Sequence, residues 1–404
     1  MFRSKRYSIW FNLVVLLIVV ALPATATGLQ APAGRLDPSF GTSGRVLTHF
    51  SSPPTNEARA MALQSDGKIV VAGYDNTRLL SSDHIAVGRY NTDGSLDTSF
   101  GSNGWVTTTV ALGSQATSVA IQSDGKIVAG GFMCLDSACL AAGVLVRYNT
   151  DGSLDASFGS GGIVTTASAD EIQGLALQAD GKIVSVGYAS VTRHNADGSL
   201  DMTFGSGGSV STSSGASVAL QSDGKIVTVG FNAVQRYNTD GSADTSFGVG
   251  GTAAISGMNS FAVAIQSDGK IIAGGYSSTG LAGAMTRFNT DGSLDSSFGS
   301  GGLVSTTAIA FFNGVALQVD GKIVAAGAAY YTSGSNTTFA VGRFNTDGSP
   351  DLSFGASGVT VTRFNARPRS NPFAMAVQSD HKIVLAGMAA ASKTVDVALA
   401  RYLP

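Results

Sequence analysis

One nine-residue stretch, Ala-Ile-Gln-Ser-Asp-Gly-Lys-Ile-Val at residues 120–128, recurs in near copies seven times along the chain. Each copy places Asp-Gly between two apolar-rich segments. That pattern favours a β-hairpin with a type I′ turn, in which both central residues have positive φ. The Asp residues of the seven turns follow one another at intervals of 43 to 60 residues: Asp66, Asp124, Asp180, Asp223, Asp268, Asp320 and Asp380. A period in this range predicts a solenoid, a propeller or an array.

The last copy has His381 where the other six have glycine. A residue with a Cβ atom rarely adopts positive φ. The seventh turn is therefore expected to be strained or to be of another type.

Two further blocks accompany every hairpin. The first is Arg-aromatic-Asn, as in Arg89-Tyr90-Asn91, with His194 in place of the usual Tyr or Phe in the third copy and only Arg401-Tyr402 in the last. The second is a turn rich in Asp and Gly that ends in Phe-Gly, and we expect its phenylalanine to fill the core. We also expect Arg89 to pair with Asp97, and the equivalent residues to pair in the other copies. The repeated phenylalanines are Phe40, Phe100, Phe158, Phe204, Phe247, Phe298 and Phe354.

These blocks carry a resemblance to a known family. The pattern Leu-Gln-x-Asp-Gly-Lys-Ile-Val-x-x-Gly, followed by Arg-Tyr-Asn-x-Asp-Gly-Ser-Leu-Asp-x-Ser-Phe-Gly, resembles the bacterial delta-60 repeat, a β-propeller domain of unknown function. The resemblance covers about residues 35–404. It implies a fold and no activity, because the family has no assigned catalytic residues to carry over.

Each repeat has four segments with the period or composition of short strands. In the second repeat these segments are residues 117–122, 126–132, 144–149 and 163–166. Four short antiparallel strands per unit are typical of a propeller blade. The first segment alternates small and large residues, which suits the crowded innermost position. The sequence thus predicts an all-β fold, a seven-bladed β-propeller of four-stranded antiparallel blades.

The ends of the chain predict how the ring closes. The last repeat has no fourth strand, whereas an unpaired turn and strand stand near the start, at residues 36–50. We expect this N-terminal strand to complete the seventh blade, since closure removes an exposed sheet edge. The propeller is predicted as a single domain over residues 35–404, after a short disordered lead at residues 27–34.

The first residues predict export. Arg3, Lys5 and Arg6 precede an apolar run at residues 9–22, and Ala24-Thr25-Ala26 is a cleavage motif. This is the pattern of a secretory signal peptide covering residues 1–26. An uncleaved anchor is the weaker alternative, because the run is shorter than the roughly 20 residues of a membrane span. We therefore expect a secreted or extracytoplasmic protein, in the periplasm or at the cell surface, with no membrane span after cleavage.

Cys134 and Cys139 lie in one loop, and in an oxidising compartment we expect them to form a disulfide rather than a metal site. The net charge of −2 gives no basic patch for nucleic acid. No cofactor and no metal is predicted, and the chain is expected to be monomeric. A calcium site in the Asn91–Asp97 turn is disfavoured, because that turn lacks the ligand spacing and the downstream Glu of a calcium loop.

The loops divide between two faces. The turns that join strands one and two, and strands three and four, lie on one face, which we call the repeat-turn face because their sequences repeat. The other loops form the variable face. There, blades three and four have short loops between strands two and three, and the other blades have long ones, so the rim should have a notch. Loops on a rigid scaffold often bind ligands. The candidate binding residues on this face are Arg78, Asp83, His84, Phe311, Phe312, Tyr330 and Tyr331, with the Cys134–Cys139 loop.

Three functions remain open from the sequence. The first is a binding or structural interaction module whose partner is an unknown protein or glycan outside the cytoplasm. The second is an extracytoplasmic hydrolase or lyase with an active site at the propeller axis, against which the Ala-rich inner strands argue. The third is a calcium-stabilised surface adhesin, which should show a thermal shift with Ca²⁺ that a chelator reverses. No catalytic residue is predicted.

Overall fold

A computed structural model describes most of the chain after residue 31. The described residues are 32–50, 55–75, 83–166, 170–213, 215–280, 282–330, 336–364, 369–391 and 394–404. Within these ranges no helix is long and apolar enough to cross a membrane. The predicted signal peptide and residues 27–31 of the predicted lead lie outside the described residues.

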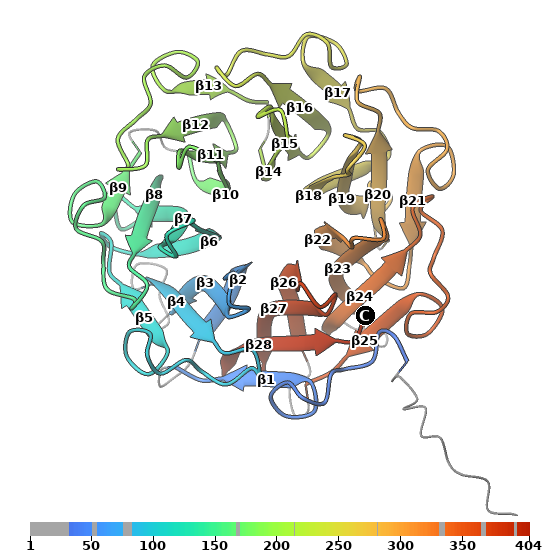
Figure 1. The fold of residues 1–404 in the computed structure, drawn as a ribbon, viewed down its shortest axis with the longest axis horizontal. Coiled ribbons are helices and arrows are strands. Elements are labelled where there is room, and N and C mark those ends of the chain that lie inside the picture. Colours follow the sequence, from blue (N-terminus) through green and yellow to red (C-terminus); the bar gives the residue numbers. More distant parts are fainter. Residues whose placement is uncertain are drawn as a thin grey trace, which may run out of the picture. The chain divides into compact units, whose positions relative to one another are not determined.

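The strands form seven four-stranded antiparallel sheets, which confirms the predicted seven-bladed propeller (Figure 1). Figure 1 shows the sheets as blades around a centre, with one strand of each blade innermost. The innermost strands are β2 (Asn56–Leu63), β6 (Ser114–Ile121), β10 (Ile172–Leu177), β14 (Ser217–Leu220), β18 (Met258–Ile265), β22 (Phe311–Leu317) and β26 (Arg369–Val377). The second strands are β3 (Ile69–Asp75), β7 (Ile127–Cys134), β11 (Ile183–Gly187), β15 (Ile226–Gly230), β19 (Ile271–Ser277), β23 (Ile323–Tyr330) and β27 (Ile383–Ala390).

The remaining strands complete the blades toward the outside. The third strands are β4 (His84–Tyr90), β8 (Ala141–Tyr148), β12 (Ser190–His194), β16 (Ala233–Tyr237), β20 (Gly283–Phe288), β24 (Thr337–Phe344) and β28 (Val395–Tyr402). The outermost strands are β5 (Trp105–Thr108), β9 (Ile163–Thr165), β13 (Ser209–Ser211), β17 (Thr252–Ala254), β21 (Leu303–Thr306), β25 (Val359–Thr362) and β1 (Arg45–Thr48). Blades one to six use consecutive strands, from β2–β5 to β22–β25.

The seventh blade joins the two ends of the chain, as the sequence predicts. Its order is β26-β27-β28-β1, and β1 pairs antiparallel with β28, with Arg45 opposite Ala400 and Thr48 opposite Val397. The predicted N-terminal strand is therefore the outer strand of the last blade. The repeated phenylalanines are fully buried, as expected for core residues.

The hairpin turns differ from the predicted type I′ turn. In the first copy the N–H of Gly67 donates to the carbonyl of Gln64, and the N–H of Gln64 donates to the carbonyl of Lys68. Gly67 has a φ of 84°, whereas Asp66 is not among the described non-glycine residues with positive φ. This is a type I turn followed by one residue in the left-handed conformation. The type I′ prediction is wrong because the loop is one residue longer than the Asp-Gly pair suggests.

His381 takes the place of that left-handed glycine, with a φ of 66°. Its N–H donates to the carbonyl of Gln378 and its carbonyl accepts from Gln318 Nε2, and glycine would retain both contacts. Because a Cβ atom is unfavourable in this conformation, we expect His381→Gly to raise the free energy of unfolding by about 0.5–1 kcal/mol. The reverse change in an ordinary copy, Gly125→His, should lower it by a similar amount. Denaturant midpoints of the two variants measure this, and a less stable His381→Gly protein would contradict it.

The innermost strands start earlier than predicted and are not regular. In the second repeat β6 begins at Ser114, not at Thr117, and its register with β7 shifts between Ala116 and Ser118. Thr117 is thus a β-bulge, one extra residue that bends the strand. Register shifts at the same place occur in six innermost strands, and the bulged residues are Arg59, Thr117, Gln173, Phe261, Asn313 and Phe373.

The bulge explains the glycine that closes strand two of the repeat. A Cβ atom at Gly131 would lie 1.9 Å from the carbonyl oxygen of Gln115, and one at Gly73 would lie 1.8 Å from that of Glu57. Main chain approaches main chain here, so only glycine fits. In each of these six inner strands, the bulge and the opposing glycine lie near the first residues of the strand, at the end beside the variable face.

Candidate functional site

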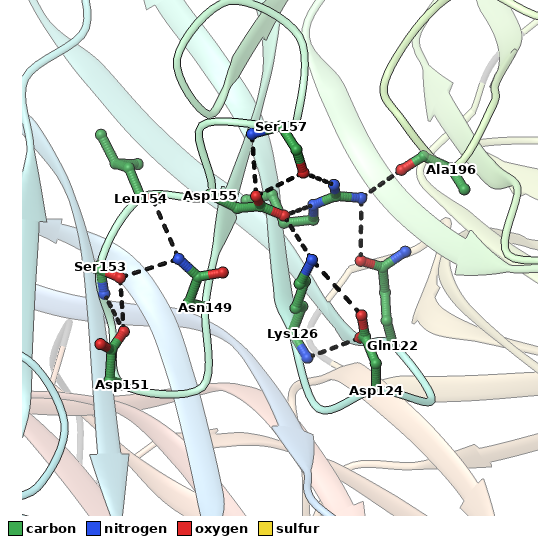
Figure 2. Close-up of polar contacts among 11 residues, drawn as sticks. Gln122, Asp124, Lys126, Asn149, Asp151, Ser153, Leu154, Asp155, Ser157 and Ala196 are labelled. Carbon is green, nitrogen blue, oxygen red and sulfur yellow. Dashed lines mark hydrogen bonds and ion pairs between the residues drawn. The ribbon is translucent and has the colours of Figure 1, made fainter.

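The repeat-turn face is held by a polar network that recurs in every blade, and Figure 2 shows it for blade two. Nε of Arg147 donates to Oδ2 of Asp155 at 2.8 Å, and Nζ of Lys126 lies 2.9 Å from the same oxygen. The other oxygen, Oδ1, accepts from both the N–H and the hydroxyl of Ser157. The predicted Arg–Asp pairing is therefore present, and the hairpin lysine joins it.

The same arginine links neighbouring blades. Nη1 of Arg147 donates to the carbonyl of Ala196 in blade three, and its guanidinium lies 4.4 Å from the ring centre of Phe158. Burial opposes ionisation of Asp155, but the hydroxyl of Ser157, the Lys126 ammonium and the Arg147 charge more than offset it. They hold the pKa of this carboxyl well below its usual range. Each charged group of the network already contacts another residue of the protein, so we interpret the network as part of the scaffold.

In the Asn91–Asp97 turn, which was considered as a calcium site, the Asp93 carboxylate also has partners within the protein. Oδ1 of Asp93 accepts from the N–H and the hydroxyl of Ser95. No group of three or more His, Cys, Asp or Glu side chains that could hold a metal ion occurs among the residues described by the structure.

A cleft of about 680 Å³ also opens on the repeat-turn face, between blades seven and one. Its charged lining includes Lys382 and Arg401, and both contact Asp37 in the seventh copy of the scaffold network. Both cationic side chains named here are therefore already paired with Asp37 in the scaffold network.

The variable face is different at its centre. The bulged residues are polar or aromatic, and so are the residues two positions before them: Glu57, Gln115, Glu171, Asn259, Phe311 and Asn371. All of these side chains except the buried Gln115 are half-buried. We call these twelve residues the axial mouth. Further along the same strands the sequence returns to small and aliphatic residues.

The densest part of the axial mouth surrounds Arg59. Its guanidinium lies 5.5 Å from the ring centre of Tyr74 and 5.2 Å from that of Phe373, which is the bulged residue of blade seven. Nη2 of Arg59 forms an ion pair with Oε2 of Glu57 at 3.1 Å. The arginine thus stands between two aromatic rings with its charge balanced, and 38% of its side chain is exposed.

Asp83 lies beside this group and is buried. Its Oδ2 accepts from Nε2 of Gln115, in the inner strand of blade two. Burial raises the pKa of Asp83; the hydrogen bond from Gln115 and the charge of His84 oppose this rise only in part, and Glu57 and Arg59 have smaller effects of opposite sign. In the described part of the chain, Oδ1 of Asp83, Oγ of Ser114 and Nε of Arg59 are buried without a hydrogen-bond partner. Buried polar atoms are rarely left so, and several in one place need an explanation.

A second aromatic group lies across the axial mouth, at blades four and five. Phe261 packs edge-on against Phe231 at 5.7 Å and stacks on Tyr276 at 5.5 Å between ring centres. Phe231 is 42% exposed and belongs to the short loop of blade four. Asn259 is the cross-strand partner of Tyr276. The notch predicted at blades three and four is present, because β11 and β12, and likewise β15 and β16, are separated by two residues each.

The predicted site residues are placed as follows. Arg78 and Tyr331 lie outside the described residues. Asp83 contacts Gln115 of the axial mouth, and the ring of His84 contacts the hydroxyl of Thr109 at 3.1 Å. Tyr330 is 50% exposed at the end of β23.

The other predicted residues divide between the core and the rim. Phe311 and Phe312 begin β22 instead of lying in the connection before it; Phe311 is half-buried, and Phe312 is fully buried against Phe344. Cys134 and Cys139 form the predicted disulfide. The structure therefore places Phe311 in the axial mouth and Asp83 beside it, and leaves His84 and Tyr330 on the surrounding loops.

Sequence reasoning missed Glu57, Arg59, Gln115 and Phe373. These residues precede or begin the repeating small-large pattern, so the sequence suggested that they belong to the loops between blades. A signal was present: the glycine that ends strand two in each repeat implied a close approach of main chain, and hence strand pairing that extends past the pattern.

Comparison with known proteins supports the fold. Six segments match the profile of one family, each from a repeat turn to its Phe-Gly block: residues 64–100, 122–158, 178–204, 221–247, 266–298 and 318–354. The seventh unit, divided between the chain ends, is not among them. No curated protein matches the sequence.

Several solved structures are similar at low identity. The extracellular domain of a putative hybrid two component system from B. thetaiotaomicron is 13% identical, with a TM-score of 0.48 over 88% of this chain. This chain spans 39% of that structure's length. A protein of unknown function from Bacteroides caccae is 12% identical, with a TM-score of 0.43 over 69% of this chain and 95% of the other. The Neurospora crassa Pan2 WD40 domain is 11% identical, with a TM-score of 0.42 over 70% and 88%. By its repeats, the chain matches the family described as "Domain of unknown function (DUF5122) beta-propeller".

Proposed function

We propose that this chain is an exported binding module of the delta-60 repeat type, and that its ligand contacts the axial mouth and the adjoining loops of the variable face. One observation carries the proposal: the two ends of the ring differ. On the repeat-turn face the same saturated network recurs in each blade, whereas the polar and aromatic side chains of the axial mouth come from six of the seven blades and vary among them, with the pair Asn and Phe shared by blades five and seven. Phe311 belongs to this proposed site, Asp83 lies beside it, and His84 and Tyr330 lie on the surrounding loops; Arg78 and Tyr331 are candidates from the sequence alone.

Export follows from the proposed signal peptide. We expect the protein recovered outside the cytoplasm to begin at Thr27, because a cleavage motif ends at Ala26. Intact-mass measurement of the exported protein tests this. Ala24→Arg and Ala26→Arg should block processing, and a mature protein that retains residues 1–26 would contradict the prediction.

The binding proposal can be tested with two matched double variants. Gln173→Ala with Asn313→Ala truncates half-buried side chains of the axial mouth. Met202→Ala with Leu352→Ala truncates side chains that are 68% and 74% exposed outside the mouth, in the turns between strands three and four. Thermal-shift screening of the exported protein against a library of sugars, amino acids, peptides and nucleotides should find ligands that only the mouth variant loses. Ligands lost only by the control variant would place binding on the opposite face.

A hydrolase or lyase at the same place is the second candidate. Glu57 and Glu171 bring two carboxyl groups to the axial mouth and Asp83 adds a third beside it, and burial raises the pKa of Asp83, as suits a general acid. The Ala-rich segments of the inner strands lie beyond the axial mouth. They argue against an active site deeper along the axis, but not against one at the mouth itself. Catalysis predicts new reducing ends from polysaccharides incubated with the protein, lost in Asp83→Asn. Binding without turnover would exclude it for the polysaccharides tested.

A further inference from the structure

The buried polar atoms around blade one include both donors and acceptors. Nε of Arg59 and Nδ2 of Asn56 can only donate, whereas Oδ1 of an ionised Asp83 and Oδ1 of Asn56 can only accept. Asn56 is fully buried, and it shares one side of β2 with Ala58, which packs against Val384 of blade seven. Unpartnered atoms therefore flank the inner strand of blade one on both sides. A group that both donates and accepts, as a hydroxyl does, suits such a mixture.

The lining of the axial mouth adds aromatic faces to these polar groups. In blades one, two and five a polar residue of the inner strand stands directly opposite an aromatic residue of the second strand: Glu57 with Tyr74, Gln115 with Phe132, and Asn259 with Tyr276. Directly opposed side chains lie side by side on one face of the sheet. Each pair therefore presents an apolar ring beside a hydrogen-bonding group.

The charges of the mouth select against an ionic ligand. Arg59 is the cation of this cluster and pairs with Glu57 at 3.1 Å, while Glu171 in the mouth and Asp83 beside it add two carboxyl groups whose pKa burial raises. An anionic ligand would have to displace Glu57, and a cationic ligand would have to compete with Arg59. A ligand without charge, with hydroxyls on its edge and an apolar face, meets neither obstacle.

We infer that the ligand of the axial mouth is a neutral carbohydrate, with a pyranose ring seated against Phe373 and Arg59 and its hydroxyls directed to Glu57 and to the half-buried amide groups of the mouth. This inference rests on the proposed function and adds its ligand class. Phe261 and Tyr276, on blade five, supply a second aromatic surface for a longer chain of sugars. Isolated apolar ligands would leave the amide and carboxyl groups of the mouth without partners, at a cost in affinity.

Calorimetric titration of the exported protein tests the inference. The probes are maltohexaose, cellohexaose, xylohexaose, mannohexaose and laminarihexaose, with trigalacturonate as the charged comparison. At least one neutral oligosaccharide should bind, and Phe373→Ala and Arg59→Met should each raise its Kd at least about tenfold, or about 1.4 kcal/mol. Phe373→Tyr, which keeps the ring, should change Kd less than about threefold, and Met202→Ala should leave it unchanged.

The outcomes separate the ligand class from the site. Binding of trigalacturonate alone would overturn the neutral class and leave the proposed mouth in place. Binding of no saccharide, while another ligand is lost in the Gln173→Ala/Asn313→Ala protein, would overturn the carbohydrate and leave the binding function. Neutral oligosaccharides bound equally well by folded Phe373→Ala and Arg59→Met proteins would overturn the site. Thermal melts of each variant show that loss of binding is not loss of fold.

Discussion

Replacing Asp37 with alanine is expected to destabilise the propeller by about 3–5 kcal/mol, because it leaves buried cations without their counter-charge. Oδ2 of Asp37 lies 2.9 Å from Nε of Arg401 and 3.3 Å from Nζ of Lys382, and both Asp37 and Arg401 are nearly inaccessible. These partners belong to the far end of the chain. In every other blade the equivalent aspartate lies eight residues after its arginine, so only here does the pair also hold the ring closed.

Three comparison variants isolate this effect. Asp97→Ala removes the same carboxylate from blade one and should cost a similar amount, without opening the ring. Asp66→Ala removes an exposed aspartate of a repeat turn, more than half exposed, and should cost under about 1 kcal/mol. Asp37→Ala combined with Arg401→Met should recover part of the loss, since the unpaired arginine is then gone. Chemical denaturation measures all four, and a wild-type midpoint for Asp37→Ala would show that this network does not hold the ring.

Acid is expected to unfold the protein cooperatively as the pH falls from about 4 toward 2. The seven scaffold aspartates all have a pKa below their usual value: Asp37, Asp97, Asp155, Asp201, Asp244, Asp295 and Asp351. A carboxyl whose pKa is lowered by folding stabilises the fold above its unfolded pKa, and that contribution is lost as the pH falls toward the folded value.

The magnitude follows from Asp37, whose pKa is lowered from 3.8 to about 2 although burial acts in the opposite direction. The hydroxyl and N–H of Ser39, Arg401 and Lys382 lower it. The shift corresponds to roughly 2 kcal/mol. Seven such sites amount to on the order of 10 kcal/mol, comparable to the whole stability of a typical domain. Burial raises the pKa of Asp83 and Glu171, which works in the opposite sense, but these are two groups against seven.

Thermal melts between pH 7 and pH 2 test this expectation. The melting temperature should change little down to about pH 4.5 and then fall steeply. In Asp37→Asn, which removes one of the titrating groups, the fall should be shallower from a lower starting value. A melting temperature that stays constant to pH 2 would contradict the assignment of these carboxylates as the acid-sensitive part of the fold.

Much of the fold was predictable because its determinants are local and repeated. A hairpin signal and a phenylalanine before glycine recur seven times, and an arginine followed after eight residues by an aspartate recurs six times, so the pattern is readable from the sequence. The missing fourth strand of the last repeat and the spare strand at residues 45–48 then determine closure. The Cys134–Cys139 disulfide was predictable for the same reason, since both residues belong to one short loop.

The turn type and the axial mouth were not predictable in this way. The turn differs from type I′ because main-chain pairing of Gln64 with Lys68 sets the loop length, and the Asp-Gly pair alone does not. The axial mouth depends on a bulge, which moves a residue without changing the composition of the strand. Arg59 and Phe373 are 314 residues apart in the sequence, and only closure of the ring brings the Arg59 guanidinium to 5.2 Å from the centre of the Phe373 ring.

The sequence by itself determined the blade, the number of blades and the pairing of the two chain ends, because each follows from contacts within a repeat or from counting strands. Only the tertiary structure decided which side chains meet at the centre. That depends on where each inner strand begins, on the bulge that bends it and on its neighbours around the ring. None of these follows from a period in the sequence, since the residues concerned are the ones that differ from blade to blade.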